Sequence, residues 1–180
     1  MEPNRMKSEP RGFRFSVVDG FTQVWTDGAC PNNGNGGARA GIGVFWGEGH
    51  KLNLSQRVVG DQQTNNVAEI QAATMSISQA MGAGITRLQV NTDSQFLINC
   101  ATDWMQKWKQ NGWKTSTGQE VKNYEDLVEL DKLLEQGTIN IKWTHVKGHS
   151  DDKGNIAADK LAVMGANLGW TVPQSGHCAY

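Results

Sequence analysis

The order of the periodic segments constrains the fold more than any single motif does. Three strand-like segments come first, and helical and strand-like segments then alternate. The segments are strands at 21–26, 39–46 and 51–59, a helix at 64–82, a strand at 88–92, helices from 93 and at 124–136, a strand at 139–144 and a helix at 155–168. Strands joined by short glycine-rich turns pair antiparallel, whereas a helix between two strands indicates a parallel pair. This order predicts an α/β fold with a five-stranded mixed sheet flanked by helices, in which the first three strands are antiparallel and the last two run parallel to the first.

Composition excludes several classes of protein. The chain has 180 residues, of which 38% are hydrophobic and 19% are charged, and no apolar run is long enough to cross a bilayer. A net charge of -1 argues against a uniformly basic nucleic-acid binder, so contacts to phosphate must come from local clusters or metal ions. Three scattered cysteines and the lack of an apolar leader favour a reducing, intracellular compartment. We expect no membrane association.

Two short segments that end in aspartate are similar to each other. Residues 24–27 read VWTD and residues 90–93 read VNTD, and we interpret each aspartate as the residue at which a strand ends. Taken singly, Asp27 or Asp93 is more typical of a turn or a helix cap than of a ligand. If the two strands are adjacent and parallel, however, both carboxylates face the crevice beyond the strand ends, where ligands bind in such sheets.

Two further acids belong to the same end of the predicted sheet. Glu69 lies near the start of one helix and Asp159 in the first turns of the last helix, although either residue alone could be a solvated helix residue. Converging carboxylates repel one another unless a cation neutralises them. Two Mg²⁺ ions, or Mn²⁺ as a substitute, held about 3.5–4 Å apart would suit phosphodiester hydrolysis.

Seven sequence blocks resemble the catalytic domain of type 1 ribonuclease H. In chain order they are TDGACPNNG, RAGIGVFWG, QTNNVAEIQA, TDSQFLIN, WKQNGWKTSTGQEV, WTHVKGHS and GNIAADKLA. The resemblance implies a ribonuclease H-like fold in which Asp27, Glu69, Asp93 and Asp159 hold two Mg²⁺ ions. It also implies an endonuclease that hydrolyses the RNA strand of RNA–DNA hybrids and leaves 5′-phosphate and 3′-hydroxyl ends.

The same resemblance places the flexible-loop histidine of the family on His149, as an aid to protonation or product release. His149 stands in a glycine-flanked segment, where a histidine can exchange protons near neutral pH. Two alternatives remain open, which are an ordinary surface histidine and a zinc pair with His145.

Substrate contacts are also implied by the resemblance. Recognition of the RNA 2′-OH suits amide and backbone groups, and the RNA-strand positions fall on Cys30, Asn33, Asn65, Asn66 and Gln95. The DNA-strand positions fall on Thr64 and Asn123 in a phosphate pocket and on Trp104, Trp108 and Ser116 in a basic protrusion. Core packing is the alternative for the tryptophans, and turn or cap roles are the alternative for the asparagines.

Three positions depart from the family pattern. Gln62 stands where the usual phosphate-pocket arginine would be, and the pocket loses a bidentate donor. Ile156 and Ala157 replace acids that often stand near the last carboxylate, whereas Asn155 matches the family there. We therefore expect weaker phosphate binding and altered metal affinity.

The expected organisation is an N-terminal tail over 1–20, a catalytic domain over 21–168 and a C-terminal tail over 169–180. We expect a monomer whose partner is an RNA–DNA hybrid duplex. Two alternatives stand beside a free-standing enzyme, namely the nuclease domain of a reverse transcriptase and a catalytically weak hybrid-binding module on the same fold.

Overall fold

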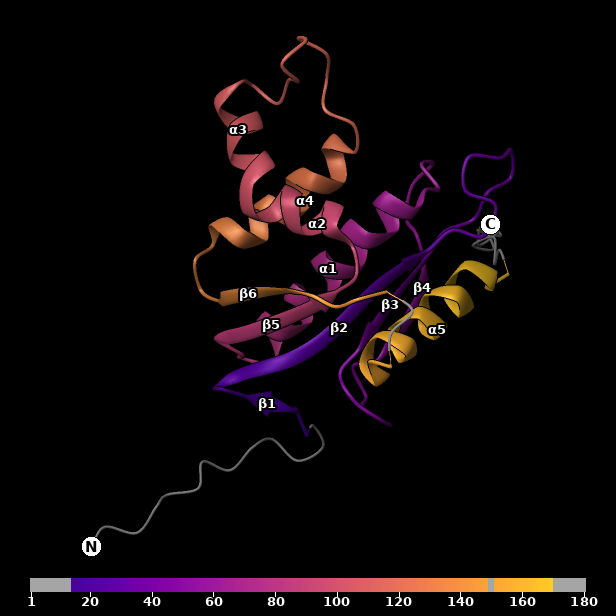
Figure 1. The fold of residues 1–180 in the computed structure, drawn as a ribbon, viewed down its shortest axis with the longest axis vertical. Helices are drawn as coiled ribbons and strands as arrows, with labels where there is room; N and C mark the ends of the chain where they lie inside the picture. The colour runs from indigo at the N-terminus through magenta and orange to yellow at the C-terminus, as the bar shows by residue number, and fades with distance from the viewer. Residues whose placement is uncertain (1–13, 149–150, 170–180) are drawn as a thin grey trace, which may run out of the picture.

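A six-stranded mixed sheet runs through the protein, which a computed structural model describes over residues 14–148 and 151–169 (Figure 1). The strands are β1 (Val17–Val18), β2 (Phe21–Ala29), β3 (Gly41–Phe45), β4 (Leu54–Arg57), β5 (Arg87–Thr92) and β6 (Asn140–His145). Their order is β4-β3-β2-β5-β6, and β1 pairs with β2 beside this path. The pairs β2–β3 and β3–β4 are antiparallel, and β2–β5 and β5–β6 are parallel. The predicted mixed α/β sheet is confirmed.

The first two helices begin at the expected capping residues, Thr64 and Ser94, whereas the last helix begins two residues before the expected Asn155 and is capped by Asp152. They are α1 (Asn65–Gly82), α2 (Gln95–Asn99), the π-helical turn η1 (Cys100–Trp104), α3 (Met105–Gln110), α4 (Tyr124–Glu135) and α5 (Lys153–Asn167). Thr64, Ser94 and Asp152 accept a hydrogen bond from a backbone N–H of the first turn of α1, α2 and α5 respectively. Among the described residues, no helix is long and apolar enough to cross a membrane.

Two helices pack on opposite faces of the central strand β2. Helix α1 buries Ile70 and Ile77 against Val24 and Val90 of β2 and β5, and α4 lies beside α1 on this face. Helix α5 lies on the other face, where it contacts β2, β3 and β4 (Figure 1). Acids on these two helices can therefore approach the same end of β2 from both sides.

Glycines in the sheet allow this close approach. A Cβ added at Gly43 would lie 2.1 Å from the carbonyl oxygen of Ala158 in α5, and one added at Gly28 would lie 2.6 Å from the backbone nitrogen of Glu69 in α1. Gly43 pairs with Asp27 across β2 and β3. The helix backbones thus rest on the strand backbone next to Asp27.

Two details of the sheet differ from the expectation. Strand β2 does not end at Asp27 but continues to Ala29, because it keeps pairing with β3 after its pairing with β5 has ended at Trp25. Strand β1 lies in the region expected to be a tail, and its two residues are too few to give a periodic signal.

Candidate metal centre and nucleic-acid interface

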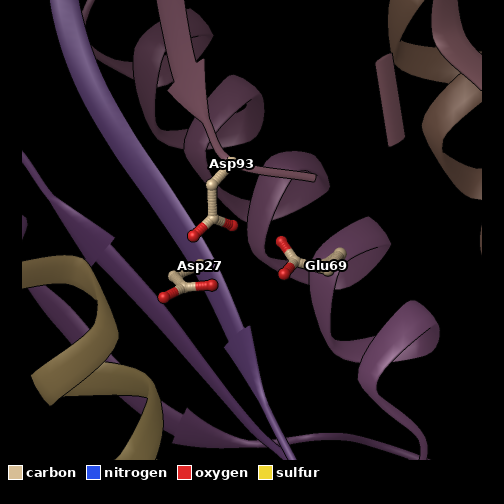
Figure 2. A group of neighbouring side chains, drawn as sticks. All are labelled: Asp27, Glu69 and Asp93. Carbon is tan, nitrogen blue, oxygen red and sulfur yellow. The ribbon is translucent and has the colours of Figure 1, made fainter. Parts of the chain in front are cut away.

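Three carboxylates from three different elements converge at one end of the sheet. Asp27 of β2, Glu69 of α1 and Asp93 after β5 each offer an oxygen, and these oxygens lie within 4.8 Å of one another (Figure 2). The parallel pairing of β2 and β5 ends at Trp25 and Asn91, two residues before each aspartate. The two similar segments of the sequence therefore place their aspartates at the same level of the sheet, where the strands separate.

Burial and mutual repulsion disfavour the charged forms of this group. Asp27 is 6% exposed and Glu69 is 3% exposed, whereas Asp93 is half-buried. Burial, followed by the charge of Asp93, raises the pKa of Asp27 from 3.8 to about 7. Burial also raises the pKa of Glu69 well above its usual 4.5, and the charges of Asp27 and Asp93 add to the effect. Three negative charges here are stable only with added positive charge.

The surroundings of the three acids fit a divalent cation. Within the described ranges, no lysine, arginine or histidine forms a salt bridge with any of them. One oxygen of Glu69, Oε2, is buried and has no hydrogen-bond partner, which is costly unless a ligand fills that role. Converging oxygen donors of this kind are the donors that hard cations such as Mg²⁺ prefer.

Helix α5 contributes Asn155 and Asp159 next to this group. Asn155 is 5% exposed, its Nδ2 donates to Asp93 Oδ2 at 3.3 Å, and its Oδ1 is buried without a partner. Asp159 is exposed and does not belong to the group within 4.8 Å, although its charge still raises the pKa of Asp27. The structure thus brings three of the four predicted acids together, and the fourth is an exposed residue of α5 whose charge still acts on Asp27.

The segment that leads to His149 passes the same site. His149 itself lies outside the described residues, so its predicted role stays a prediction. Nearby, a Cβ on Gly148 would lie 3.2 Å from Asp93 Oδ2, and Nε2 of His145 lies 3.2 Å from the backbone oxygen of Asp93. From the sequence, His145 was a candidate only as a zinc ligand, because nothing local in the sequence indicates this contact.

Four of the five residues predicted to contact RNA lie around the start of α1, and the fifth, Gln95, begins α2. Asn33 Oδ1 accepts a hydrogen bond from the backbone nitrogen of Asn65 at 3.4 Å, and the Cys30 thiol donates to the Gln63 backbone oxygen at 3.3 Å. Asn65 precedes Glu69 by four residues, so the two share one face of the helix. Asn66 is exposed in the first turn of α1, and Gln95 is exposed at the start of α2. Amide groups therefore stand beside the carboxylates.

The charged residues at the expected phosphate pocket are mostly acids. Thr64 caps α1 through its hydroxyl oxygen, and Asn123 has a left-handed backbone conformation at the start of α4, with φ of 62°. Asn123 and Gln62 line a cavity of about 570 Å³. Its charged lining residues are Asp61, Glu120, Lys122, Glu125 and Asp126. This lining makes the cavity less favourable for a phosphate than the resemblance implies.

The predicted protrusion is less basic than its sequence indicates. The rings of Trp104 and Trp108 lie 5.9 Å apart, and both side chains are half-buried against the main core. Lys107 pairs with Asp103 at 2.7 Å, and Lys109 pairs with Asp131 at 2.8 Å and also with Glu135. These carboxylates lie up to 26 positions away, so the lysine pattern alone overstates the positive charge. Ser116 is exposed in the loop between α3 and α4.

Comparisons with known proteins agree with this architecture. The RNase H family profile matches residues 20–167. Ribonuclease H1 of Homo sapiens is 53% identical over 84% of this chain and 52% of its own length, so the chain spans about half of that relative. Ribonuclease H of Actinobacillus pleuropneumoniae serotype 5b is 38% identical over 82% of this chain and 91% of its own length.

Solved structures show the same fold. LC9-RNase H1, a type 1 RNase H with the type 2 active-site motif, has a TM-score of 0.61 and 27% identity, covering 80% of this chain and 71% of its own. The foamy viral protease–reverse transcriptase in complex with dsDNA has a TM-score of 0.66 and 23% identity, covering 81% of this chain and 93% of its own, and supports the fold alone. On its sequence and its fold, the chain belongs to the ribonuclease H family.

Proposed function

We propose that this chain is an endonuclease that hydrolyses the RNA strand of RNA–DNA hybrids in a reaction that depends on two Mg²⁺ ions. One observation carries the proposal: three carboxylates, two of them buried, converge where β2 and β5 separate, and no cationic side chain of the described residues pairs with them. Membership of the ribonuclease H family supports the reaction type.

In this proposal Asp27, Glu69, Asp93 and Asp159 would hold the ions. When bound, the ions would supply Lewis acidity for the attacking water and for the departing 3′ oxygen. Asn155 would orient Asp93 through the amide hydrogen bond at 3.3 Å. Breaking the P–O3′ bond leaves a 3′-hydroxyl on one fragment and a 5′-phosphate on the other. His149 would assist protonation or product release.

Residues on both sides of the carboxylates would select the hybrid. Asn33, Asn65 and Asn66, with Cys30 and Gln95, offer amide and backbone groups for the RNA 2′-OH. Thr64, Asn123, Trp104, Trp108 and Ser116 would contact the DNA strand. Because four acids and one base line the Asn123 cavity, and because Gln62 stands there, we assign this cavity a smaller share of the affinity.

Replacing Asp93 by Asn tests the proposal, because the change keeps the shape of the side chain and removes one ligand charge. With Mg²⁺, cleavage of a labelled hybrid should fall more than about 100-fold, since even groups that only support a ligand change activity 10–100-fold. Hybrid affinity, measured by fluorescence anisotropy, should stay near the wild-type value. Asp19→Asn, an exposed substitution in the β1–β2 turn, is the matched control. Wild-type cleavage by the Asp93→Asn variant would contradict the assignment of Asp93.

A further inference from the structure

The described helices cover one face of the sheet only in part. Helix α5 contacts β2, β3 and β4, and β5 and β6 extend past it with their other face packed towards α1 and α2 (Figure 1). Leu88 and Thr22 form a register pair, and Leu88 points into the core. Because side chains alternate along a strand, their neighbours Phe21 and Arg87 point to the uncovered face.

Two cations share one aromatic ring on this face. Arg87 Cζ lies 4.3 Å from the ring centroid of Phe21, and Lys142 Nζ lies 5.8 Å from it. Lys142 belongs to β6 and pairs in register with Gln89 of β5. Phe21, Arg87 and Lys142 thus come from three adjacent strands, and we call them the cluster. The pairing of these strands holds the two cations close to the Phe21 ring.

Neither cation of this cluster is neutralised by a carboxylate in the part of the chain that the structure describes. Lys107, Lys109 and Lys132, in contrast, all form ion pairs. Arg87 and Lys142 are at most about 10 Å apart, which is about one Debye length at 0.1 M salt. Two exposed like charges at this separation attract an anion.

The cluster is aligned with the carboxylates. Phe21 and Asp27 are six positions apart on β2, and Arg87, the first residue of β5, is six positions before Asp93, which directly follows that strand. Even separations keep residues of one strand on one face, and six positions span ~20 Å. A strand of nucleic acid that leaves the carboxylate site along β2 and β5 would reach the cluster after about six nucleotides, at 3.4 Å of rise for each.

We propose that the Phe21–Arg87–Lys142 cluster binds the single-stranded nucleic acid that flanks a hybrid held at the carboxylate site. This inference rests on the proposed function. An exposed guanidinium plane can stack on an unpaired base, and the Lys142 ammonium can bind the adjacent phosphate. A single strand, which has unpaired bases to offer, fits this combination better than an acidic peptide does.

Binding of blunt and extended hybrids tests the inference. Fluorescence anisotropy with Ca²⁺ in place of Mg²⁺ would compare a short blunt hybrid with the same hybrid extended by about six unpaired nucleotides, at each of its ends in turn. For at least one end, the extension should tighten wild-type binding several-fold. It should also steepen the dependence of log K on log salt by about 0.7, which is the contribution of one phosphate contact of a single strand, here the contact to Lys142.

The double variant Arg87→Gln/Lys142→Gln should lose this gain and keep its affinity for the blunt hybrid. Lys142→Gln alone, at an exposed position, should lose most of the added salt dependence and keep part of the gain in affinity, and it keeps the test valid if the Arg87 change disturbs the local structure. Lys51→Gln, an exposed charge-matched control on the β3–β4 connection, should keep the full gain.

Three outcomes would overturn the inference. The first is that no extension tightens wild-type binding, and the second is that the gain persists in the double variant. The third is that the wild type binds a polyglutamate peptide, that the double variant binds this peptide more weakly, and that no nucleic-acid extension tightens binding. That result would make the cluster a site for an acidic protein. If the blunt hybrid itself fails to bind, it is the proposed function that fails.

Discussion

Removing the charge of Asp27 should stabilise the protein when no divalent cation is bound. Asp27 is 6% exposed and faces Glu69 and Asp93, and no cationic side chain among the described residues pairs with it. Asp27→Asn keeps the size of the side chain and the oxygen that accepts from the Gly28 N–H at 2.8 Å. The substitution therefore removes mainly the cost of a buried negative charge.

The size of the effect follows from the pKa of Asp27. Its rise from 3.8 to about 7 is a change of about 3, which corresponds to about 4 kcal/mol at about 1.4 kcal/mol for each pKa unit. Glu69 can take up a proton and relieve part of the same repulsion, because the two carboxyls titrate together. We therefore expect Asp27→Asn to raise the free energy of unfolding by about 2 kcal/mol above neutral pH.

The pH dependence has a definite sign. Because folding raises the pKa of Asp27, its stabilising contribution is complete below the unfolded value of about 3.8 and is lost as the pH rises through about 7. The wild type should therefore lose stability relative to Asp27→Asn across this window. Above it, the difference between the two proteins should stay constant.

Urea unfolding in EDTA, followed by tryptophan fluorescence, would measure this difference at about pH 5 and about pH 8.5. The gain from Asp27→Asn should grow by about 1 kcal/mol or more between these pH values. Adding Mg²⁺ should stabilise the wild type more than the variant, since a cation that binds the folded state shifts the equilibrium. Asp19→Asn should show neither effect. A variant less stable than the wild type at the higher pH, or a gain independent of pH, would refute the reasoning.

Three further substitutions test other parts of the site. Gln62→Arg should tighten hybrid binding and steepen its salt dependence by about 1, because it returns a phosphate donor to an acid-lined cavity; an unchanged salt slope in a titration would contradict this. Asn155→Ala should raise the Mg²⁺ concentration needed for half-maximal cleavage about 10-fold by removing the hydrogen bond to Asp93, and an unchanged requirement would show that the bond is dispensable. Gly43→Ala should lower the free energy of unfolding by about 3 kcal/mol, since its Cβ would lie 2.1 Å from the Ala158 oxygen. Gly36→Ala has open space around the added Cβ and should be nearly neutral, so equal melting temperatures for the two glycine variants would argue against close packing of α5.

Much of the sheet and of the carboxylate group could be predicted because both depend on local patterns. Alternation and turn residues indicate the strands, and the similar segments at 24–27 and 90–93 indicate that Asp27 and Asp93 end up side by side. The capping signal at Thr64 places Glu69 in the second turn of α1. The strand ends and the helix cap are local signals, whereas the approach of the two aspartates also requires that β2 and β5 pair in parallel, which the structure shows.

Other features depend on tertiary contacts that leave no local signal. The strand at Asp27 continues because β3 still pairs with it, and Gly43 matters because α5 rests on its backbone. The hydrogen bond between Asn155 and Asp93 spans 62 positions, and the one between Lys109 and Asp131 spans 22. A lysine-rich stretch therefore indicated more free charge than the folded protein has.

Cleavage of an RNA–DNA hybrid is the most direct test of the central claim. The hybrid would carry a label on the RNA strand and would be incubated beside duplex RNA and duplex DNA, with Mg²⁺ and with EDTA. We predict internal cuts only in the RNA of the hybrid and only with Mg²⁺, with 5′-phosphate and 3′-hydroxyl ends. A hybrid that stays intact with Mg²⁺ at high protein concentration, or one that is cut equally in EDTA, would contradict a metal-dependent ribonuclease H activity.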